Sequence, residues 1–359
     1  MHFGAPLDDS RLEALLRPGA DISTVITADV YGAGEADTVL GHSLHALARS
    51  QYQLVGAIGH DFYTGNRQGA KGYPRFTDPA LRGPDDYAPY IRMAVERSLE
   101  RIGVDAFDVL LLHNPDRTGY TDERVWDGMA AVRDAGLAGA LGVAPGPANG
   151  FTLDLIDCLE RFGDRIDWAM VILNPLEPWP GELVLDAARR HEVRLITRVV
   201  DYGGLFHDDV LPGHEFAQRD HRSFRPAGWV ERGRERLDRM RPIAERHGLT
   251  MLQLACAWNL AHDPVACVAP TLIQEIDGRP IEEKRAELAA VPADPVLSAD
   301  EVAEIRAIGD NTGSMALKGA APDFEGDPLP DRWPLSPDLA ALAERWSIDP
   351  QRDLARVGV

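Results

Sequence analysis

Lysine is scarce in this chain, and acidic residues far outnumber basic ones. Of 359 residues, 37 are Lys or Arg and 57 are Asp or Glu, which gives a formal net charge of −20. The only lysines are Lys71, Lys284 and Lys318, so arginine supplies almost all of the positive charge. A surface this acidic repels phosphate groups, which argues against nucleic acids and anionic membranes as partners.

Other absences exclude further classes of protein. The cysteines form no CxxC motif and lie in apolar stretches, which favours buried thiols in a reducing cytoplasm; they are Cys158, Cys256 and Cys267. No apolar run is long enough for a transmembrane helix, and the start MHFGAPLDDS lacks the features of a signal peptide. No HxxxH or HExxH motif occurs, so we expect no catalytic metal and place the protein in the cytoplasm.

Short apolar runs alternate with longer segments in which apolar residues recur every three or four positions. The expected strands span residues 23–28, 53–58, 107–113, 138–143, 167–173, 193–200 and 265–270. The expected helices span roughly residues 35–49, 90–103, 122–135, 152–162, 181–191, 231–247, 250–261, 280–290 and 299–308. Almost continuously apolar strands that alternate with helices indicate a parallel sheet covered on both faces. One uninterrupted alternation, without a GxGxxG loop, favours a (β/α) barrel over a doubly wound sheet.

Two long strand-to-helix connections and the C-terminal tail depart from this alternation. The connections span residues 60–86 and 206–228, and in a barrel both lie on the catalytic face. The tail is rich in Pro and Trp and is too apolar for a free linker. We expect a barrel domain over residues 1–311 and a C-terminal extension over residues 312–359 that packs on it.

Two strand ends carry residues suited to proton transfer. Tyr31 follows the first expected strand in TADVYGAGEADTVLG, where small neighbours leave its phenol accessible. His113 ends the otherwise apolar strand of VLLLHNPD, at the end from which the catalytic groups of a barrel project. Either residue alone is more often structural than catalytic, but the two motifs together are specific.

These motifs resemble those of the aldo-keto reductase superfamily. ADVYGAGEADTVLG corresponds to the family pattern D-T-A-x-x-Y-G-x-G-x-S-E-x-x-L-G, and FDVLLLHNPD corresponds to y-D-l-l-x-L-H-x-P-D. The similarity continues through AAVRDAGLAGALGV, VILNP and LQLACAWNLA and covers about residues 1–310. It implies an α/β fold, the (β/α)₈ TIM barrel of aldo-keto reductase type. We expect its first strand to be truncated or missing, with the tail as an extended C-terminal cap.

The resemblance implies that Tyr31 is the general acid and base and that His113 orients the carbonyl or hydroxyl group. The Lys and Asp that tune the family's tyrosine are absent, because their positions hold His60 and Ile26. A Lys ammonium favours the phenolate, and a carboxylate keeps that Lys charged. Imidazole titrates near pH ~6.5, so we expect His60 to be a second proton carrier that is a cation only part of the time.

The side chains through which the family holds NADP are also absent. Ala144 and Pro145 replace the S-N pair that binds the nicotinamide carboxamide, and Met170 replaces a Gln on the next strand. The phosphate-binding I-P-G segment reads APTLIQEIDGRP, in which Arg279 is the nearest cation. We therefore favour the absence of a cofactor, with NADP as the alternative.

Three hypotheses follow from these substitutions. The first is an enzyme that acts on a small carbonyl or sugar-like compound, such as a keto sugar or glycoside, through Tyr31 and His113. Its chemistry is NAD(P)-independent elimination, isomerisation or hydrolysis. The second is an NAD(P)(H)-dependent aldo-keto oxidoreductase in which His60 replaces the Lys. The third is a non-catalytic binding or regulatory barrel, which the joint retention of Tyr31, His113 and His60 disfavours.

Polar residues at other strand ends are candidates for substrate binding. They are Arg198, Asp201, Asn174 and Tyr202. Arg198 either clamps a carboxylate or phosphate group or pairs with Asp201 at the barrel rim. Tyr202 or Phe206 is the candidate for an aromatic ring that stacks on a nicotinamide. The expected partner is a small molecule, and a homo-oligomer is compatible with the sequence.

Overall fold

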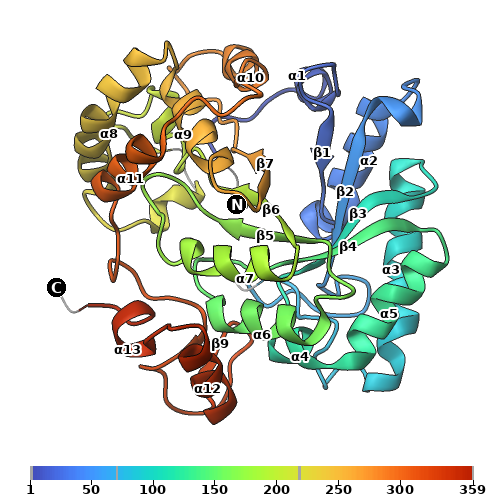
Figure 1. The fold of residues 1–359 in the computed structure, drawn as a ribbon. Coiled ribbons are helices and arrows are strands. Elements are labelled where there is room, and N and C mark those ends of the chain that lie inside the picture. Colours follow the sequence, from blue (N-terminus) through green and yellow to red (C-terminus); the bar gives the residue numbers. More distant parts are fainter. Residues whose placement is uncertain (1–2, 70–71, 217–219, 358–359) are drawn as a thin grey trace. The chain divides into compact units, whose positions relative to one another are not determined.

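The computed structural model of the chain describes residues 3–69, 72–216 and 220–357 (Figure 1). Lys71 of the first long connection lies outside the described residues. The contacts divide the chain into two compact units. The larger unit comprises residues 16–170, 183–195 and 312–359, and the smaller unit comprises residues 1–15, 171–182 and 196–311.

Seven strands form the central sheet in the order of the chain, from β1 to β7. They are β1 (Thr24–Ile26), β2 (Gln53–Ile58), β3 (Phe107–His113), β4 (Ala138–Ala144), β5 (Trp168–Ile172), β6 (Arg194–Arg198) and β7 (Val265–Ala269). The pairs from β1 to β5 are parallel, and Val55 lies opposite Val109. This confirms the parallel α/β sheet predicted from the alternation. No strand precedes β1 in residues 3–23, so the first strand of the eight-stranded pattern is missing.

Helices α2, α3 and α5 of the larger unit lie side by side along strands β1–β4 (Figure 1). The helices of this part are α2 (Glu35–Leu44), α3 (Tyr87–Ile102), α4 (Arg117–Thr121), α5 (Glu123–Asp134), α6 (Thr152–Phe162) and α7 (Leu185–Arg190). The apolar spacing of α3 places Ile91, Val95 and Leu99 on its buried face. In β3, Leu110 and Leu111 point to opposite faces, and both are fully buried. A strand buried on both faces reads as a continuous apolar run, which is why its bounds were predictable.

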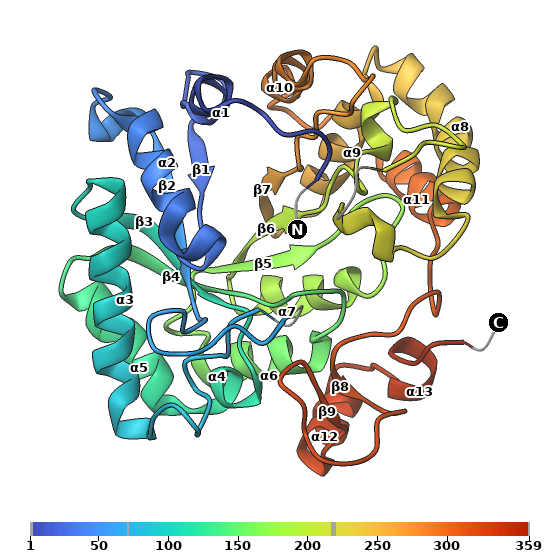
Figure 2. The ribbon, with the colours of Figure 1, turned by 180° about the vertical axis from the view of Figure 1, so that it is seen from behind.

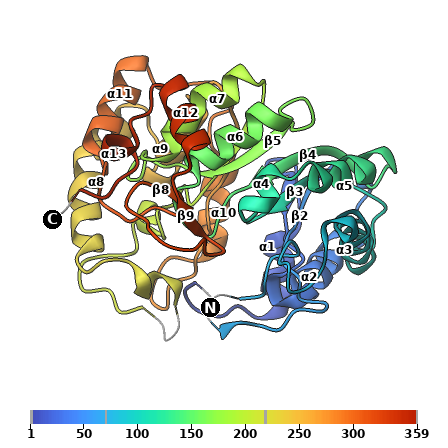
Figure 3. The same ribbon diagram turned by 90° about the horizontal axis from the view of Figure 1, so that it is seen from below.

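The smaller unit consists largely of helices (Figure 3). They are α1 (Asp9–Leu16), α8 (Trp229–Arg246), α9 (Met251–Leu260), α10 (Ile281–Ala289) and α11 (Ala299–Ile308). Almost every residue of α9 is buried, and its neighbours are α8, α10 and β7. Trp258 of α9 donates its indole N–H to the carbonyl oxygen of Val302 in α11, at 3.1 Å. The apolar helix α9 is therefore the core of this unit.

The C-terminal tail packs on α6 within the larger unit. Its strands β8 (Gly319–Ala321) and β9 (Arg332–Pro334) pair in parallel, and α12 (Pro337–Arg345) and α13 (Pro350–Asp353) follow (Figure 2). Asp154 of α6 is fully buried and accepts hydrogen bonds from the Ala320 amide and the Trp333 indole, both at 2.9 Å. A buried carboxylate needs such donors, so Asp154 fixes the tail. The domain boundary expected at residue 311 stays a prediction.

Replacing Trp333 by Phe should destabilise the protein, because the buried Asp154 carboxyl then loses one of its donors. We expect a loss of about 1–3 kcal/mol in the free energy of unfolding, measured by urea denaturation. Trp346→Phe is the matched control, since the Trp346 indole donates to Glu160 at the surface. That variant should lose less than about 1 kcal/mol. Equal losses in the two variants would contradict the role given to Asp154.

Candidate active site

Tyr31 follows β1 in a tight turn, and 55% of its side chain is exposed. Its amide donates to the Ala28 carbonyl oxygen at 2.9 Å. The next three residues all have positive φ angles, 62° at Gly32, 54° at Ala33 and 99° at Gly34. Left-handed backbone of this kind favours glycine, so the glycines that flank Ala33 hold the tyrosine at the surface of the turn.

Asp37 of α2 anchors this turn from the buried side. Its carboxylate accepts hydrogen bonds from the hydroxyls of Thr27 and Ser98, both at 2.8 Å, and from the Arg101 guanidinium at 2.9 Å. Gly34 lies against the same guanidinium, and a Cβ at this position would come within 2.8 Å of Nε. Position 34 therefore requires glycine for both its backbone angle and its close approach to α3.

The structure brings together the three residues that the sequence nominated for proton transfer. His113, at the end of β3, lies between the rings of Tyr31 and His60, with centroid distances of 5.7 Å and 5.5 Å. Both ring pairs are edge-on. Gly59 permits this approach, because a Cβ there would come within 2.0 Å of the His113 carbonyl oxygen. His60 and His113 are buried, whereas Tyr31 is open to solvent.

The surroundings of His60 do not agree with its predicted role as a proton carrier and part-time cation. Its Nδ1 lies 2.8 Å from the Tyr73 carbonyl oxygen, which can only accept, so Nδ1 carries the proton. Nε2 then accepts from the amide nitrogen of Asn114 at 3.1 Å. Burial, followed by the charge of Arg75, lowers the pKa of His60 to about 4. The imidazole is therefore neutral at pH 7, and both of its nitrogens are already bonded.

Arg75, which the sequence analysis missed, is the cation beside His60. Its Nε donates to the Asn114 carbonyl oxygen at 2.6 Å, and its Nη2 forms an ion pair with Asp331 of the tail. The side chain is only 7% exposed. Asn114 adopts a φ of 49°, a left-handed conformation that asparagine tolerates, and so contacts Arg75 and His60 at once. Neither contact has a local sequence signal beyond the HNPD motif itself.

Asp29, two residues before Tyr31, is a buried carboxyl group that lacks a partner. It is completely inaccessible, and neither oxygen has a hydrogen bond of ordinary geometry among the described residues. Burial, followed by the nearby charge of Asp37, raises its pKa well above the usual range. The folded protein therefore favours the neutral, protonated form of Asp29 more than water does.

Two of the predicted substrate-binding residues are instead buried components of turns in the smaller unit. Asp201 is fully buried and accepts from the amides of Thr271 and Gly204, at 2.7 Å and 2.8 Å. Asn174 is fully buried as well, and its amide group bonds to the backbone of Glu177 and Val199. Because their polar atoms are taken up by backbone groups, neither residue is available to a substrate.

Tyr202 and Arg198 are half-buried. The Arg225 guanidinium lies 4.2 Å from the centroid of the Tyr202 ring, and Tyr202 has a φ of 50°. Phe206 is 1% exposed, so it is not the aromatic that could stack on a nicotinamide. The binding roles expected for Tyr202 and Arg198 stay predictions.

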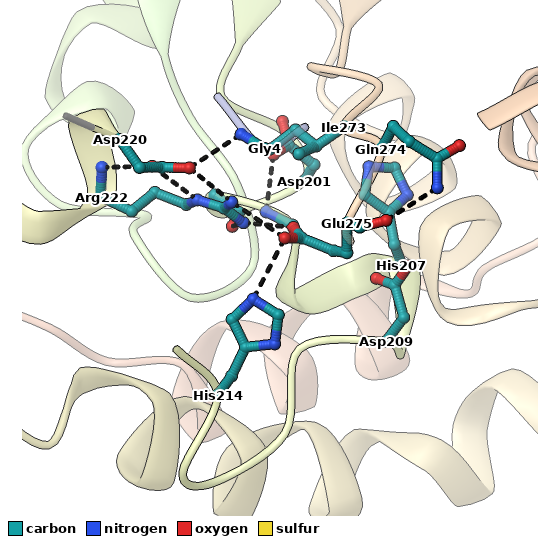
Figure 4. A network of polar contacts seen from close by, with 12 residues as sticks. Gly4, Asp201, His207, Asp209, His214, Asp220, Arg222, Ile273, Gln274 and Glu275 are labelled. Atoms are coloured by element: carbon teal, nitrogen blue, oxygen red, sulfur yellow. Dashed lines mark hydrogen bonds and ion pairs between the residues drawn. The ribbon is translucent and has the colours of Figure 1, made fainter. Parts of the chain in front are cut away.

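The smaller unit also holds the segment 269–280, where the resemblance places the phosphates of a dinucleotide. Figure 4 shows Glu275 of this segment joined to Arg222 and His214, with Asp220 also joined to Arg222. Arg222 is buried and forms ion pairs with both Asp220 and Glu275. Burial alone would raise the pKa of Asp220, but hydrogen bonds from Arg222 lower it to about 2. His214 contacts the second oxygen of Glu275 at 3.1 Å (Figure 4).

The other two cations near this segment are paired in the same way. Lys284, which is fully buried, lies 2.5 Å from Asp209, and Arg279 lies 2.5 Å from Glu287. Arg222, Arg279 and Lys284 are thus each paired with a carboxylate. In the larger unit, Ala144 and Met170 are buried and carry no side-chain donor or acceptor for a carboxamide. The described residues do not fit NADP held through the family's side chains.

The described residues contain neither a metal-binding cluster nor a helix suited to cross a membrane. No group of three or more His, Cys, Asp or Glu side chains is arranged to hold a metal ion there. None of the helices in residues 3–69, 72–216 and 220–357 is both long and apolar enough to cross a membrane.

Comparison with known proteins gives a family match over most of the chain. The model of the "Aldo/keto reductase family" matches residues 11–310. A probable voltage-gated potassium channel subunit beta from Arabidopsis thaliana is 23% identical over 323 residues, covering 84% of this chain and 89% of that protein. A 6-dehydroglucose reductase from Agrobacterium fabrum is 24% identical over 274 residues, covering 73% of this chain and 76% of that protein.

Solved structures with the same fold include two enzymes of this type. A glycerol dehydrogenase from Gluconobacter oxydans has a TM-score of 0.63 and 19% identity, covering 87% of this chain and 91% of that one. An aldo/keto reductase from Klebsiella pneumoniae, in complex with NADP and acetate, has a TM-score of 0.53 and 20% identity, with 84% of each chain covered. These comparisons do not support the prediction of NAD(P)-independent lyase, isomerase or hydrolase chemistry. They favour its alternative, an oxidoreductase.

Replacing Asp29 by Asn should stabilise the protein at neutral pH. The folded pKa of Asp29 lies above the unfolded value, so the free energy of unfolding falls as pH rises between the two, by up to ~1.4 kcal/mol per pH unit. Asparagine lacks this dependence, so the gain should be largest at pH 7 and disappear near pH ~4. Urea denaturation at several pH values measures it. Asp37→Asn, which weakens the pairing of Arg101, should destabilise; a loss of stability in both variants would contradict this assignment.

Proposed function

Because the chain belongs to the aldo/keto reductase family, we propose that it is an oxidoreductase that interconverts carbonyl and hydroxyl groups of small sugar-like or polyol compounds. The observation that carries this proposal is the retained pair of Tyr31 and His113. Their rings lie 5.7 Å apart, one after β1 and the other at the end of β3, and the phenol is open to solvent. A small carbonyl oxygen can therefore reach the phenol beside His113.

In this reaction the two residues transfer a proton and orient the substrate oxygen. When a carbonyl group is reduced, its oxygen gains negative charge and must be protonated. Tyr31 supplies that proton as general acid and removes it in the reverse direction, and His113 positions the oxygen. His60 is not a proton carrier in this proposal, because its two ring nitrogens bond to Tyr73 and Asn114. It instead packs against His113 and fixes the orientation of that ring.

The substrate class rests on the comparisons and on the polarity of the first long connection. One relative is named for a dehydroglucose and one solved neighbour for glycerol. The connection over residues 60–86 begins beside His60 and contains hydroxyl, amide and guanidinium groups. Groups of this kind bind the hydroxyls of a polyol through hydrogen bonds.

The redox partner proposed for this reaction is NAD(H) in preference to NADP(H). A nicotinamide, when bound, exchanges the hydride in such a reaction. The cations around residues 269–280 are paired with Asp209, Asp220, Glu275 and Glu287, so a 2′-phosphate would meet carboxylates without a free cation among the described residues. Like charges at such close range are unfavourable. The NADP present in one neighbour therefore does not transfer to this chain.

Purified protein should oxidise NADH faster than NADPH in the presence of small aldehydes and ketones such as glyceraldehyde, dihydroxyacetone or aldehydic hexose derivatives. Absorbance of the reduced nicotinamide measures the rate. Tyr31→Phe should lower kcat by about 100-fold or more, because it removes the proton donor. Tyr52→Phe is the matched control: Tyr52 is buried just before β2, at the opposite end of that strand, and its loss of a hydroxyl should leave kcat unchanged.

Binding of the cofactors themselves separates this proposal from the remaining hypotheses. Titration followed by protein fluorescence should give a lower Kd for NADH than for NADPH. If neither nucleotide binds at millimolar concentration, the oxidoreductase proposal is wrong. Tighter binding of NADPH would refute only the cofactor preference.

A further inference from the structure

The strand ends of this site have lost the charge pair that the family uses to tune its tyrosine. His60 stands in place of the Lys but is neutral, and Ile26 stands in place of the Asp. The two lysines among the described residues belong to other elements, Lys284 to α10 and Lys318 to the segment just before β8. A positive charge, if the site has one, must come from an element other than these strands.

The first long connection supplies such a charge in a fixed position. After leaving β2 it returns antiparallel to the strand end, with Arg75 opposite His60. The Phe76 amide donates to the Gly59 carbonyl oxygen at 3.0 Å, and the Asp61 amide donates to the Pro74 carbonyl oxygen at 2.8 Å. The place of the guanidinium is therefore set by backbone pairing and not by a flexible loop. Its Nε bond to the Asn114 carbonyl oxygen joins it to the segment that follows His113.

The counter-ion of Arg75 comes from the C-terminal tail. Asp331 immediately precedes β9, and its carbonyl oxygen accepts from the Gly319 amide of β8 at 2.8 Å. The same tail is held on α6 by Asp154 through Ala320 and Trp333. The carboxylate that pairs with Arg75 is thus part of a packed element. A buried arginine that lost this partner would be an uncompensated charge.

We propose that Arg75 and Asp331 replace the family's Lys–Asp pair in this site, with Arg75 as a positioning residue for His60 and His113. The inference rests on the proposed function. Arg75 holds Asn114 by its carbonyl oxygen, and Asn114 in turn donates to His60, which packs on His113. Burial first, and then the permanent charge of Arg75, lowers the pKa of His60 and keeps the imidazole neutral.

Other charged or titratable groups around His60 come from every packed element. Tyr90 of α3 donates its hydroxyl to the His60 carbonyl oxygen at 2.9 Å, and His113 contacts the ring. Asp61, the next residue, is paired with Arg82 and is fully buried. Asp331 is paired with Arg75. Among these groups Arg75 is the cation that lowers the pKa of His60.

The titration of the His60 imidazole, followed by NMR of ring-labelled protein, tests this assignment without a substrate or cofactor. Wild-type His60 should titrate near pH 4. Arg75→Gln should raise that pKa by one unit or more, and Arg75→Lys should keep it low because the charge is retained. Asp331→Asn should not raise it, because Arg75 keeps its charge. Arg49→Gln, which removes the same charge at a site paired with Asp108, should leave the pKa of His60 unchanged.

Activity gives a second, separate measurement. Arg75→Gln should lower kcat at least 10-fold with little change in KM, and Arg75→Lys should restore part of kcat.

An unchanged His60 pKa in Arg75→Gln would overturn the assignment, as would a kcat equal to that of wild type in an active enzyme. Should no oxidoreductase activity exist while the His60 pKa shifts as expected, the proposed function fails and the placement of the charge stands. If Arg75→Gln does not fold, the comparison of wild type, Arg75→Lys and Asp331→Asn decides: a raised His60 pKa in Arg75→Lys overturns the assignment.

Discussion

A buried guanidinium has to be paired, and the pairing of Arg75 determines how the ends of β2 and β3 are organised. Arg75 donates to the carbonyl oxygen of Asn114 and forms an ion pair with Asp331. The side-chain amide of Asn114 in turn donates to His60. The imidazole is left with one possible tautomer, because Tyr73 offers only an acceptor. The orientation of His113, and with it the edge-on contact to Tyr31, follows from packing against this fixed ring.

Lysine is scarce in this chain, and the cation beside His60 is an arginine, which needs a different set of partners from a lysine. A lysine ammonium at the strand end is a point charge, and one carboxylate is enough to hold it. An arginine has a planar fork of donors that can bind a carbonyl oxygen and a carboxylate at the same time, as Arg75 does. The change from lysine to arginine thus requires partners in other directions, and the tail supplies one of them. The C-terminal extension is in this view tied to the site as well as to α6.

The sequence predicted the strands and the ring cluster because both depend on local pattern. An apolar run such as that of β3 marks a strand buried on two faces, and a polar residue at its end marks the edge where Tyr31, His60 and His113 meet. The charge pair was not predictable in this way, because Arg75 and Asp331 are 256 positions apart.

Asp201 and Asn174 were misjudged for a different reason. A polar side chain at a strand end serves equally well to bind the amides of the following turn, and only burial distinguishes the two uses. The predicted role of His60 conflicts with its burial as well, because removal from water destabilises the charged form of an imidazole relative to the neutral form.

The same rule of pairing bears on the cofactor. Among the described residues, a phosphate that approached residues 269–280 would compete with the carboxylates that already pair with Arg222, Lys284 and Arg279. Breaking a buried pair leaves an uncompensated carboxylate behind, which is costlier than the new contact is favourable. Glu275 already accepts from both Arg222 and His214. A dinucleotide whose ribose carries a neutral hydroxyl in place of the phosphate avoids this exchange, which is the physical basis of the proposed preference for NAD(H).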